Sequence, residues 1–179
     1  MIDPEVLYEK YYGDNPPLRR ILTLHSQMVA RHALRSLDIH PELEVDRRFV
    51  YEAAMLHDIG IFLTDAPSIH CYGKEHYLCH GLLGGRLLRR EGLPRHARVA
   101  ERHTGTGLTA AEIARRELPL PHQDFLPETV EEKLVCYADK FYSKTRLTEE
   151  KPVEQILRGI EKFGPEGVDK FLEWHKLFG

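Results

Sequence analysis

A histidine and an aspartate, His57 and Asp58, stand side by side at the end of an apolar stretch that begins at Ala53. Burying both side chains at a helix end is costly unless another group neutralises them. A divalent metal ion would do so, because neutral imidazole and carboxylate are both common metal ligands. A buried His–Asp hydrogen bond without a metal is the alternative interpretation, and the doublet alone does not decide between the two.

Helical patterns dominate the sequence around this doublet. Apolar periodicity and capping residues predict helices over 4–11, 17–37, 46–57, 80–91, 94–103 and 128–143. A capping box over 109–112 predicts a further short helix, and the tail is expected to hold one or two more, divided at Gly164-Pro165. Residues 64–79 and 118–127 are expected to be loops, and we find no convincing strand pattern. The sequence therefore predicts an all-α, non-repeat helical bundle.

Helical spacing turns further polar side chains toward the interior that receives His57. His25, His103 and Asp139 each lie four residues after an apolar residue of a predicted inner stripe, and His80 begins a helix with an apolar inner face. A single inward histidine is usually a core residue with a hydrogen-bond partner. An inward aspartate is harder to explain, because carboxylates are rarely buried unpaired. Five such sites on five helices favour a shared metal centre, which helical bundles build from facing helices.

The order of these residues resembles that of the HD-domain superfamily of metal-dependent phosphohydrolases, and the segment 57–60 resembles its HDIG variant. The resemblance covers roughly residues 25–144. It implies a basic metal-ligand set of His25, His57, Asp58 and Asp139, to which members with two metals add two histidines in the positions of His80 and His103. By the same pattern, Asp58 would bridge the two ions.

The resemblance also sets expectations for the domain and the substrate. We expect one domain over 1–179, with an HD core at about 18–144 and a C-terminal helical extension at about 152–178. The segments that begin at His80 and His103 resemble the bacterial subgroup that hydrolyses dinucleoside tetraphosphates symmetrically. An additional loop and helix over about 108–127 depart from that pattern, so the substrate is not carried over, and we expect this stretch to influence specificity.

The implied chemistry is hydrolysis of a phosphate ester or anhydride of a nucleotide or a related small molecule. Six nitrogen and oxygen ligands without a thiolate suit Fe, Mn, Zn, Co or Ni. Two such ions, about 3.5–4 Å apart, would activate a water for in-line attack on phosphorus. A phosphate also needs fixed cations. Lys140 and Lys144, close to Asp139, are the first candidates for catalysis and substrate binding, and Lys74 and Arg102 follow as substrate-binding candidates.

Other histidines and the cysteines receive separate predictions. His76 lies four residues before His80 and is the alternative ligand; we favour His80, because the spacing to the glycine that follows leaves room for close packing. His32 is expected to be half-exposed, with a role beside the ligands as the alternative. Five further histidines lack a supporting pattern and are predicted to lie on the surface or in loops: His40, His70, His96, His122 and His175. The three cysteines form no CxxC and are expected to be small buried or half-buried hydrophobes: Cys71, Cys79 and Cys136.

Net charge and hydropathy limit which partners and locations we expect for the protein. The formal net charge of −3 argues against a surface that coats nucleic acid. No apolar run approaches the roughly 20 residues that span a bilayer, and the acidic N-terminus has no signal core, so we expect a cytoplasmic protein. The sequence is compatible with either a monomer or a homodimer. No Walker loop, Rossmann fingerprint or Gly-Tyr-Pro motif of cyclic-dinucleotide hydrolases is present. A di-iron oxygenase of the same fold and a non-catalytic nucleotide sensor are the alternative functions.

Overall fold

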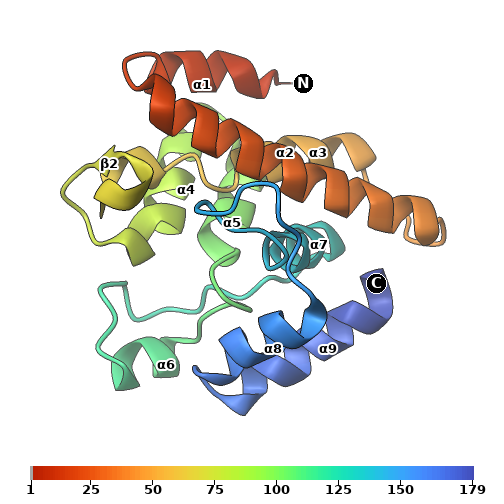
Figure 1. Ribbon diagram of the computed structural model, residues 1–179. Helices are drawn as coiled ribbons and strands as arrows, with labels where there is room; N and C mark the ends of the chain where they lie inside the picture. Colours follow the sequence, from red (N-terminus) through yellow and green to blue (C-terminus); the bar gives the residue numbers. More distant parts are fainter. Residues whose placement is uncertain (1) are drawn as a thin grey trace.

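The protein is built almost entirely of helices (Figure 1). The computed structural model describes residues 2–179. Its α-helices are α1 (Pro4–Tyr12), α2 (Pro16–Ile39), α3 (Arg47–Leu56), α4 (His80–Arg90), α5 (Pro94–Arg102), α6 (Ala110–Arg115), α7 (Val130–Asp139), α8 (Val153–Glu161) and α9 (Pro165–Phe178). Three short 3₁₀ helices, η1 (Ile61–Leu63), η2 (Pro67–Ile69) and η3 (Tyr77–Cys79), lie between α3 and α4. The all-α prediction is confirmed.

Local sequence signals account for where the helices begin and end. Asp46 caps α3 by accepting a hydrogen bond from the backbone N–H of Phe49 at 3.0 Å. Capping boxes at Thr109 and Thr129 start α6 and α7, because each threonine side chain binds the backbone of a glutamate three residues later. Gly164, at φ 131°, separates α8 from α9 where the sequence predicted the division.

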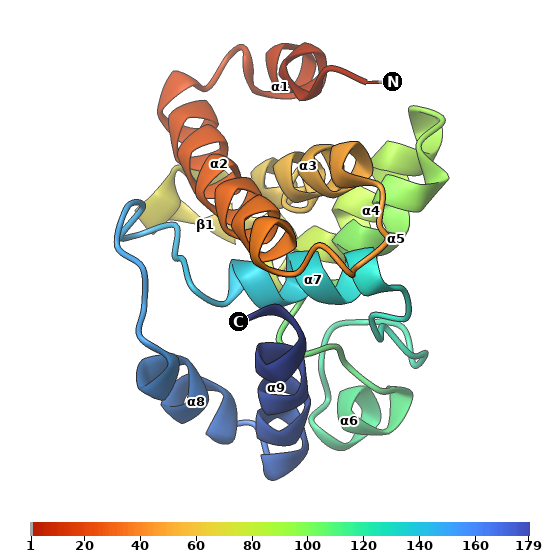
Figure 2. The ribbon, with the colours of Figure 1, turned by 90° about the vertical axis from the view of Figure 1, so that its right-hand side faces the viewer.

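Helix α7 occupies the centre of the bundle, in contact with α2, α3, α5 and α9 (Figures 1 and 2). Helices α2 and α3 pack side by side, as do α4 and α5. Apolar residues from all of these helices form one continuous core, in which α9 takes part through Phe171, Trp174 and Phe178. In both views α6, α8 and α9 lie below α7, on the side away from α1 and α3. No helix within residues 2–179 is both long and apolar enough to cross a membrane.

A close backbone contact places the turn after Asp58 against α4. A Cβ atom added to Gly60 would lie 2.3 Å from the carbonyl oxygen of His80 and 2.4 Å from the backbone nitrogen of Gly84. Any side chain at position 60 would therefore push α4 away. The glycine of the HDIG segment thus allows the first residue of α4, His80, to approach Asp58.

Two predictions about secondary structure are wrong. The expected loop over 64–79 contains two strands, β1 (Asp65–Ala66) and β2 (Cys71–Tyr72), which pair antiparallel. Each strand has two residues, too few to show an alternating pattern. Helix α7 ends at Asp139 instead of continuing to 143. Beyond this end, the carbonyls of Lys140 and Tyr142 accept hydrogen bonds from Nζ of Lys151 at 3.1 and 3.0 Å.

Candidate metal centre

The six predicted ligands come together where five helices meet. His25 lies within α2, His80 is the first residue of α4, and Asp139 is the last residue of α7. His57 and His103 directly follow the last residues of α3 and α5. All four histidines are buried, with exposed fractions of 0–6 %, and Asp58 is completely buried. Because most of the ligands sit at helix ends, the helices can converge on one point without crossing it.

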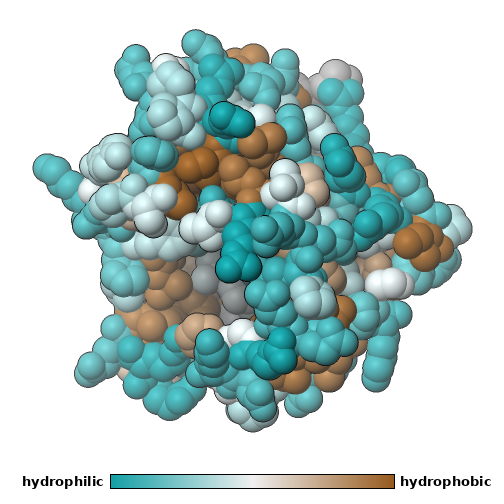
Figure 3. Space-filling view, viewed as in Figure 1, coloured by the Kyte–Doolittle hydropathy of each residue, from teal (hydrophilic) through white to brown (hydrophobic). Residues whose placement is uncertain are grey.

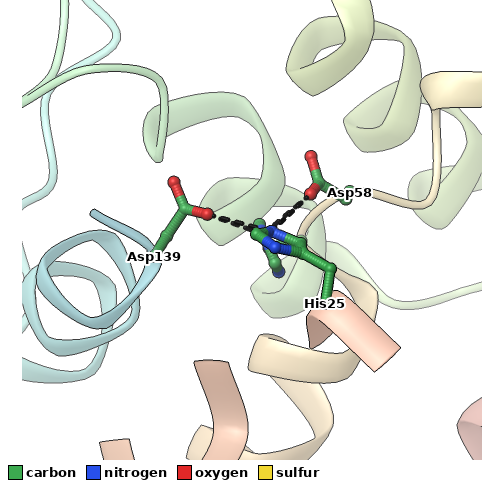
Figure 4. Close-up of side chains that lie close together, drawn as sticks. His25, Asp58 and Asp139 are labelled. Carbon is green, nitrogen blue, oxygen red and sulfur yellow. Dashed lines mark hydrogen bonds and ion pairs between the residues drawn. The ribbon is translucent and has the colours of Figure 1, made fainter. Parts of the chain in front are cut away.

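Four of these residues form a first cluster. Its imidazole nitrogens face two carboxylates: Nε2 of His25 lies 3.1 Å from both Asp58 Oδ2 and Asp139 Oδ1 (Figure 4). Nε2 of His57 lies 3.0 Å from Asp58 Oδ2 and 3.4 Å from Asp139 Oδ1. One ligand atom from each residue lies within 4.8 Å of the other three, so the cluster could hold a metal ion.

A second cluster shares Asp58 with the first. Here Nε2 of His80 and Nε2 of His103 lie 3.2 and 3.5 Å from Asp58 Oδ1. The carboxylate of Asp58 therefore directs Oδ2 toward the first cluster and Oδ1 toward the second. These three residues also satisfy the spacing of a metal-ligand group.

Hydrogen bonds to helix ends orient three of the four histidines. Nδ1 of His57 donates to the carbonyl of Ala54 at 2.6 Å, and Nδ1 of His103 donates to the carbonyl of Ala100 at 2.8 Å. His80 makes the equivalent bond to Tyr77 at 2.7 Å. In each case the acceptor is the backbone carbonyl three residues earlier in the chain. With the proton on Nδ1, each Nε2 presents a lone pair, as a metal ligand requires.

The ligand atoms fit a divalent cation. Buried polar atoms without hydrogen-bond partners are rare, yet His57 Nε2 and both carboxylate oxygens of Asp58 make no well-aligned hydrogen bond, although ion-pair contacts surround them. Nε2 of His80 and Nε2 of His103 are 3.0 Å apart, so two lone pairs would face each other without a cation between them. With ligands about 2.1 Å from a metal, neighbouring donor atoms should be about 3.0–3.4 Å apart. The histidine–carboxylate and His80–His103 contacts, at 3.0–3.5 Å, are close to this spacing.

Charge balance keeps the two carboxylates ionised. Burial alone would raise the pKa of Asp58, but the charges of His57 and Lys144 outweigh burial and hold this pKa well below its usual range. Asp139 behaves in the same way, with Lys140 as the main opposing charge that lowers its pKa. Burial opposes protonation of His57, yet Asp58 raises its pKa to about 9. Burial lowers the pKa of His103 to about 4. Without a metal, His57 therefore carries a second proton, on Nε2, at neutral pH and is cationic, whereas His103 is neutral; a metal bound to His57 would replace that proton.

Two predicted lysines lie at this centre. Nζ of Lys144 is 2.6 Å from Asp58 Oδ2, and Nζ of Lys140 is 2.8 Å from Asp139 Oδ2. Both lysines line a cavity of about 970 Å³ that also reaches His25 and Asp139. The space-filling view shows this face of the molecule hollowed to the left of centre, with hydrophobic surface beside the hollow (Figure 3).

The structure does not bring the other two predicted cations to the cavity. Lys74 is exposed and lies outside the lining residues. Arg102 is held by the carboxylates of Glu128 and Glu132, at 2.7 and 3.4 Å, and by the carbonyl of Leu126. These acceptors fix the arginine to the start of α7, so it stabilises the helix arrangement instead of facing a ligand.

His76 and His32 differ in how they relate to the centre. His76 is exposed, and its Nδ1 accepts a hydrogen bond from the backbone N–H of Leu78 at 3.1 Å. His32 was expected to be half-exposed, which is wrong, because only 5 % of it is exposed. Its ring stacks on Phe141 at 4.1 Å, since the segment after α7 covers it. It belongs to neither ligand cluster.

Among the remaining histidines, His96 contradicts its prediction as a surface residue. It is buried, and its Nε2 lies 3.2 Å from a carboxylate oxygen of Glu52. His70 and His122 are exposed, and His40 and His175 are half-buried. All three cysteines are free and buried, as predicted.

Two residues beside the centre were not predicted. The ring of Tyr77 stacks on His80 at 4.8 Å and lies 5.8 Å from Nζ of Lys144. Burial raises the pKa of Tyr77 to about 12, so its hydroxyl stays protonated. Lys151 lines the cavity and holds the segment after α7 through its two carbonyl contacts. Neither residue has a sequence signal, because each depends on how the loops fold back.

Comparison with known proteins agrees with this geometry. The HD-domain family model matches residues 23–143, about two thirds of the chain. This protein belongs to the HD-domain family. The match is consistent with the HD superfamily of metal-dependent phosphohydrolases, so the resemblance predicted from the residues is confirmed. No solved structure matches the chain.

Three curated relatives of this HD-domain protein carry two different names. The chain is 35% identical over 128 residues to a tRNA (cytidine(56)-2'-O)-methyltransferase of Picrophilus torridus, covering 71% of this chain and 33% of the relative. A methyltransferase of the same name from Thermoplasma volcanium is 29% identical over 141 residues, which are 78% of this chain and 37% of the relative. The chain thus spans about a third of these methyltransferases. Uncharacterized protein MJ0778 of Methanocaldococcus jannaschii is 34% identical over 149 residues, 78% of this chain and 79% of the relative.

Proposed function

We propose that this HD-domain protein is a metal-dependent phosphohydrolase that acts on a nucleotide or a related small phosphate compound. The observation that carries the proposal is the division of the Asp58 carboxylate between two clusters, with Oδ2 facing His25 and His57 and Oδ1 facing His80 and His103. A carboxylate arranged in this way suits two divalent ions. A transition metal such as Fe, Mn, Zn, Co or Ni agrees with this set of nitrogen and oxygen donors.

Bound metal ions would supply a nucleophilic water at neutral pH and polarise a phosphoryl oxygen. The chain's own groups would then bind and orient the substrate. Lys140 and Lys144 line the same cavity as Asp139, so their ammonium groups can contact the phosphoryl oxygens of a substrate placed there. Both lysines are also held in place by carboxylates of the ligand set, which limits the rearrangement that binding requires.

The relatives support a substrate that contains a nucleotide. Two of them are named as tRNA methyltransferases, although the matching segment forms only about a third of each. We do not propose methyl transfer for this chain, because the residues gathered in its cavity are metal ligands and lysines, which suit phosphate chemistry.

The decisive experiment combines metal analysis with a substrate screen. Protein purified without oxygen is analysed for bound metals, and phosphate release is then measured across mono- and dinucleotides with and without oxygen. Phosphate release under anaerobic conditions supports the proposal. Turnover that strictly requires O₂ would instead indicate a di-iron oxygenase, and tight nucleotide binding without cleavage would indicate a sensor.

A matched pair of lysine variants tests the role of the cavity cations. Lys144→Ala should reduce phosphate release about 10–100-fold, because one charge-assisted contact to the phosphoryl group is lost. Lys176→Ala removes an exposed lysine of α9 that does not line the cavity and should leave the rate unchanged. Equal rates of phosphate release for the two variants would show that Lys144 has no role in the reaction.

A further inference from the structure

The cavity extends well beyond the metal centre. Ligand pockets usually measure about 300–1,000 Å³, so a cavity of about 970 Å³ is large for a single phosphate group. One end is lined by His25, Asp139, Lys140 and Lys144. The remote end is formed by residues of α6, of α8 and of the turns that follow them, and in Figures 1 and 2 these helices lie below α7, away from α3 and α4. The two ends therefore contact different parts of any bound ligand.

The remote end carries positive charge that the protein does not neutralise. Lys140 and Lys144 at the metal end are paired with carboxylates. Arg116, Arg158 and Lys162 line the remote end. None of the three forms an ion pair within 4.0 Å among residues 2–179, although the charge of Arg116 helps to lower the pKa of Glu112. Glu112, four residues before Arg116, is an acidic residue that also lines the cavity. Its Oε2 already accepts hydrogen bonds from the backbone N–H and hydroxyl of Thr109, at 2.9 and 2.8 Å.

An aromatic side chain holds one of these cations. The guanidinium of Arg116 lies 4.9 Å from the ring centre of Phe163, a residue that is 59 % exposed. Stacking on an aromatic ring keeps the planar guanidinium in position while leaving its N–H groups free for an anion. Leu118 and Ile160 line the same end and provide apolar surface beside it. A base or sugar could pack on this surface while an anionic group contacts Arg116.

We propose that the remote end, formed by Arg116, Lys162 and Phe163, is a second anion-binding subsite, and that the substrates are nucleotides with two anionic groups. One phosphate would be cleaved at the metal centre while the other is held by Arg116 and Lys162. This inference rests on the proposed phosphohydrolase function. Lys162 and Phe163 lie outside the segment that matches the HD-domain family, whereas Arg116 lies within it. The subsite therefore joins the family segment to the chain that follows it.

Adenosine 3',5'-bisphosphate and the 5'-phosphorylated dinucleotide pApA test the proposal against adenosine 5'-monophosphate. Affinities for metal-loaded protein are measured by calorimetry, and phosphate release is followed in parallel. At least one of the ligands with two anionic groups should bind about tenfold more tightly than the monophosphate, which is the effect expected of one additional charge-assisted contact. Arg116→Gln and Lys162→Gln should each remove most of this preference and change monophosphate affinity less than about threefold.

Arg115→Gln is the matched control for Arg116→Gln, because Arg115, the last residue of α6, directly precedes Arg116, is exposed and does not line the cavity. It should keep the full preference. Equal affinity of the unmodified protein for ligands with one and two anionic groups would overturn the subsite, as would the absence of any binding. The subsite would also be overturned if Arg116→Gln and Lys162→Gln weakened the binding of both kinds of ligand to the same extent. The two proposals fail separately. Tighter binding of the ligands with two anionic groups, without phosphate release, would support the subsite and contradict the hydrolase proposal. Phosphate release without this difference in affinity would support the hydrolase proposal and contradict the subsite.

Discussion

The two ends of the cavity differ in how completely the protein satisfies its own charges. At the metal end, buried imidazoles, carboxylates and lysines contact one another at 2.6–3.5 Å. At the remote end, Arg116 has an aromatic ring as its neighbour, and Lys162 is exposed. The fold therefore pairs the charges of the metal end internally, whereas Arg116 and Lys162 at the remote end lack an ion-pair partner within residues 2–179. Under the proposed function, the groups that react would be held in place before the substrate binds, and those that recognise its second anionic group would be paired only by the ligand.

Removing the shared carboxylate should have the largest effect. Asp58→Ala takes away the ligand that belongs to both clusters, so metal content and phosphate release should both fall to background, a loss of more than about 1,000-fold in rate. Elemental analysis and a phosphate assay measure the two quantities. Asp65→Ala, at an exposed aspartate of β1, serves as the control. Near-normal activity of Asp58→Ala would refute the metal mechanism.

Acid should weaken metal binding at the first cluster. The pKa of His57 is raised to about 9 without a metal, so the ion must displace a proton at every pH below that value. Apparent affinity should therefore rise about tenfold per pH unit well below pH 9, or about 50-fold from pH 7 to 9, and level off above. His103, with a pKa of about 4, adds no such competition in this range. Calorimetry in buffers of different ionisation enthalpy would detect the released proton; a flat profile contradicts the expectation.

Glycine substitutions compare packing at the two ends. Gly60→Ala forces a Cβ against the backbone of α4 and should lower the free energy of unfolding by about 2–3 kcal/mol. Gly159→Ala in α8 meets no atom within 4 Å, so it should be neutral or stabilise the protein by up to about 1 kcal/mol through helix propensity. Urea unfolding measures both values. Similar costs at the two positions would show that the remote end is as tightly packed as the metal end.

The smallest expected change is in metal stoichiometry. His80→Ala or His103→Ala should reduce the number of bound ions from two toward one, because the first cluster keeps all its ligands. His76→Ala should retain both ions, since His76 is exposed and bonded to the backbone of η3. Elemental analysis of the three variants distinguishes His80 from His76 as the ligand. If His80→Ala binds as many ions as the unmodified protein, His80 is not a ligand of a second ion.

The residues at the metal end of the cavity were predicted from the sequence much better than those at its remote end. His25, His103 and Asp139 were found because helical periodicity turns them inward, and periodicity survives in the sequence. The misassigned residues depend on other segments. His32 is buried by the chain after α7, His96 by its contact with Glu52, and Arg102 is held by Glu128 and Glu132. No local pattern records such contacts.

The sequence by itself determined the all-α class, the approximate helices and which polar side chains turn toward the interior, because capping and apolar spacing are local properties of the chain. Only the tertiary structure decided that Asp58 divides its oxygens between two clusters and that Arg102 faces carboxylates instead of the cavity. It also joined Arg116 to Phe163 across 47 positions of sequence. Such relations arise when distant segments pack to bury apolar surface, and which charges then remain without partners is set by that packing.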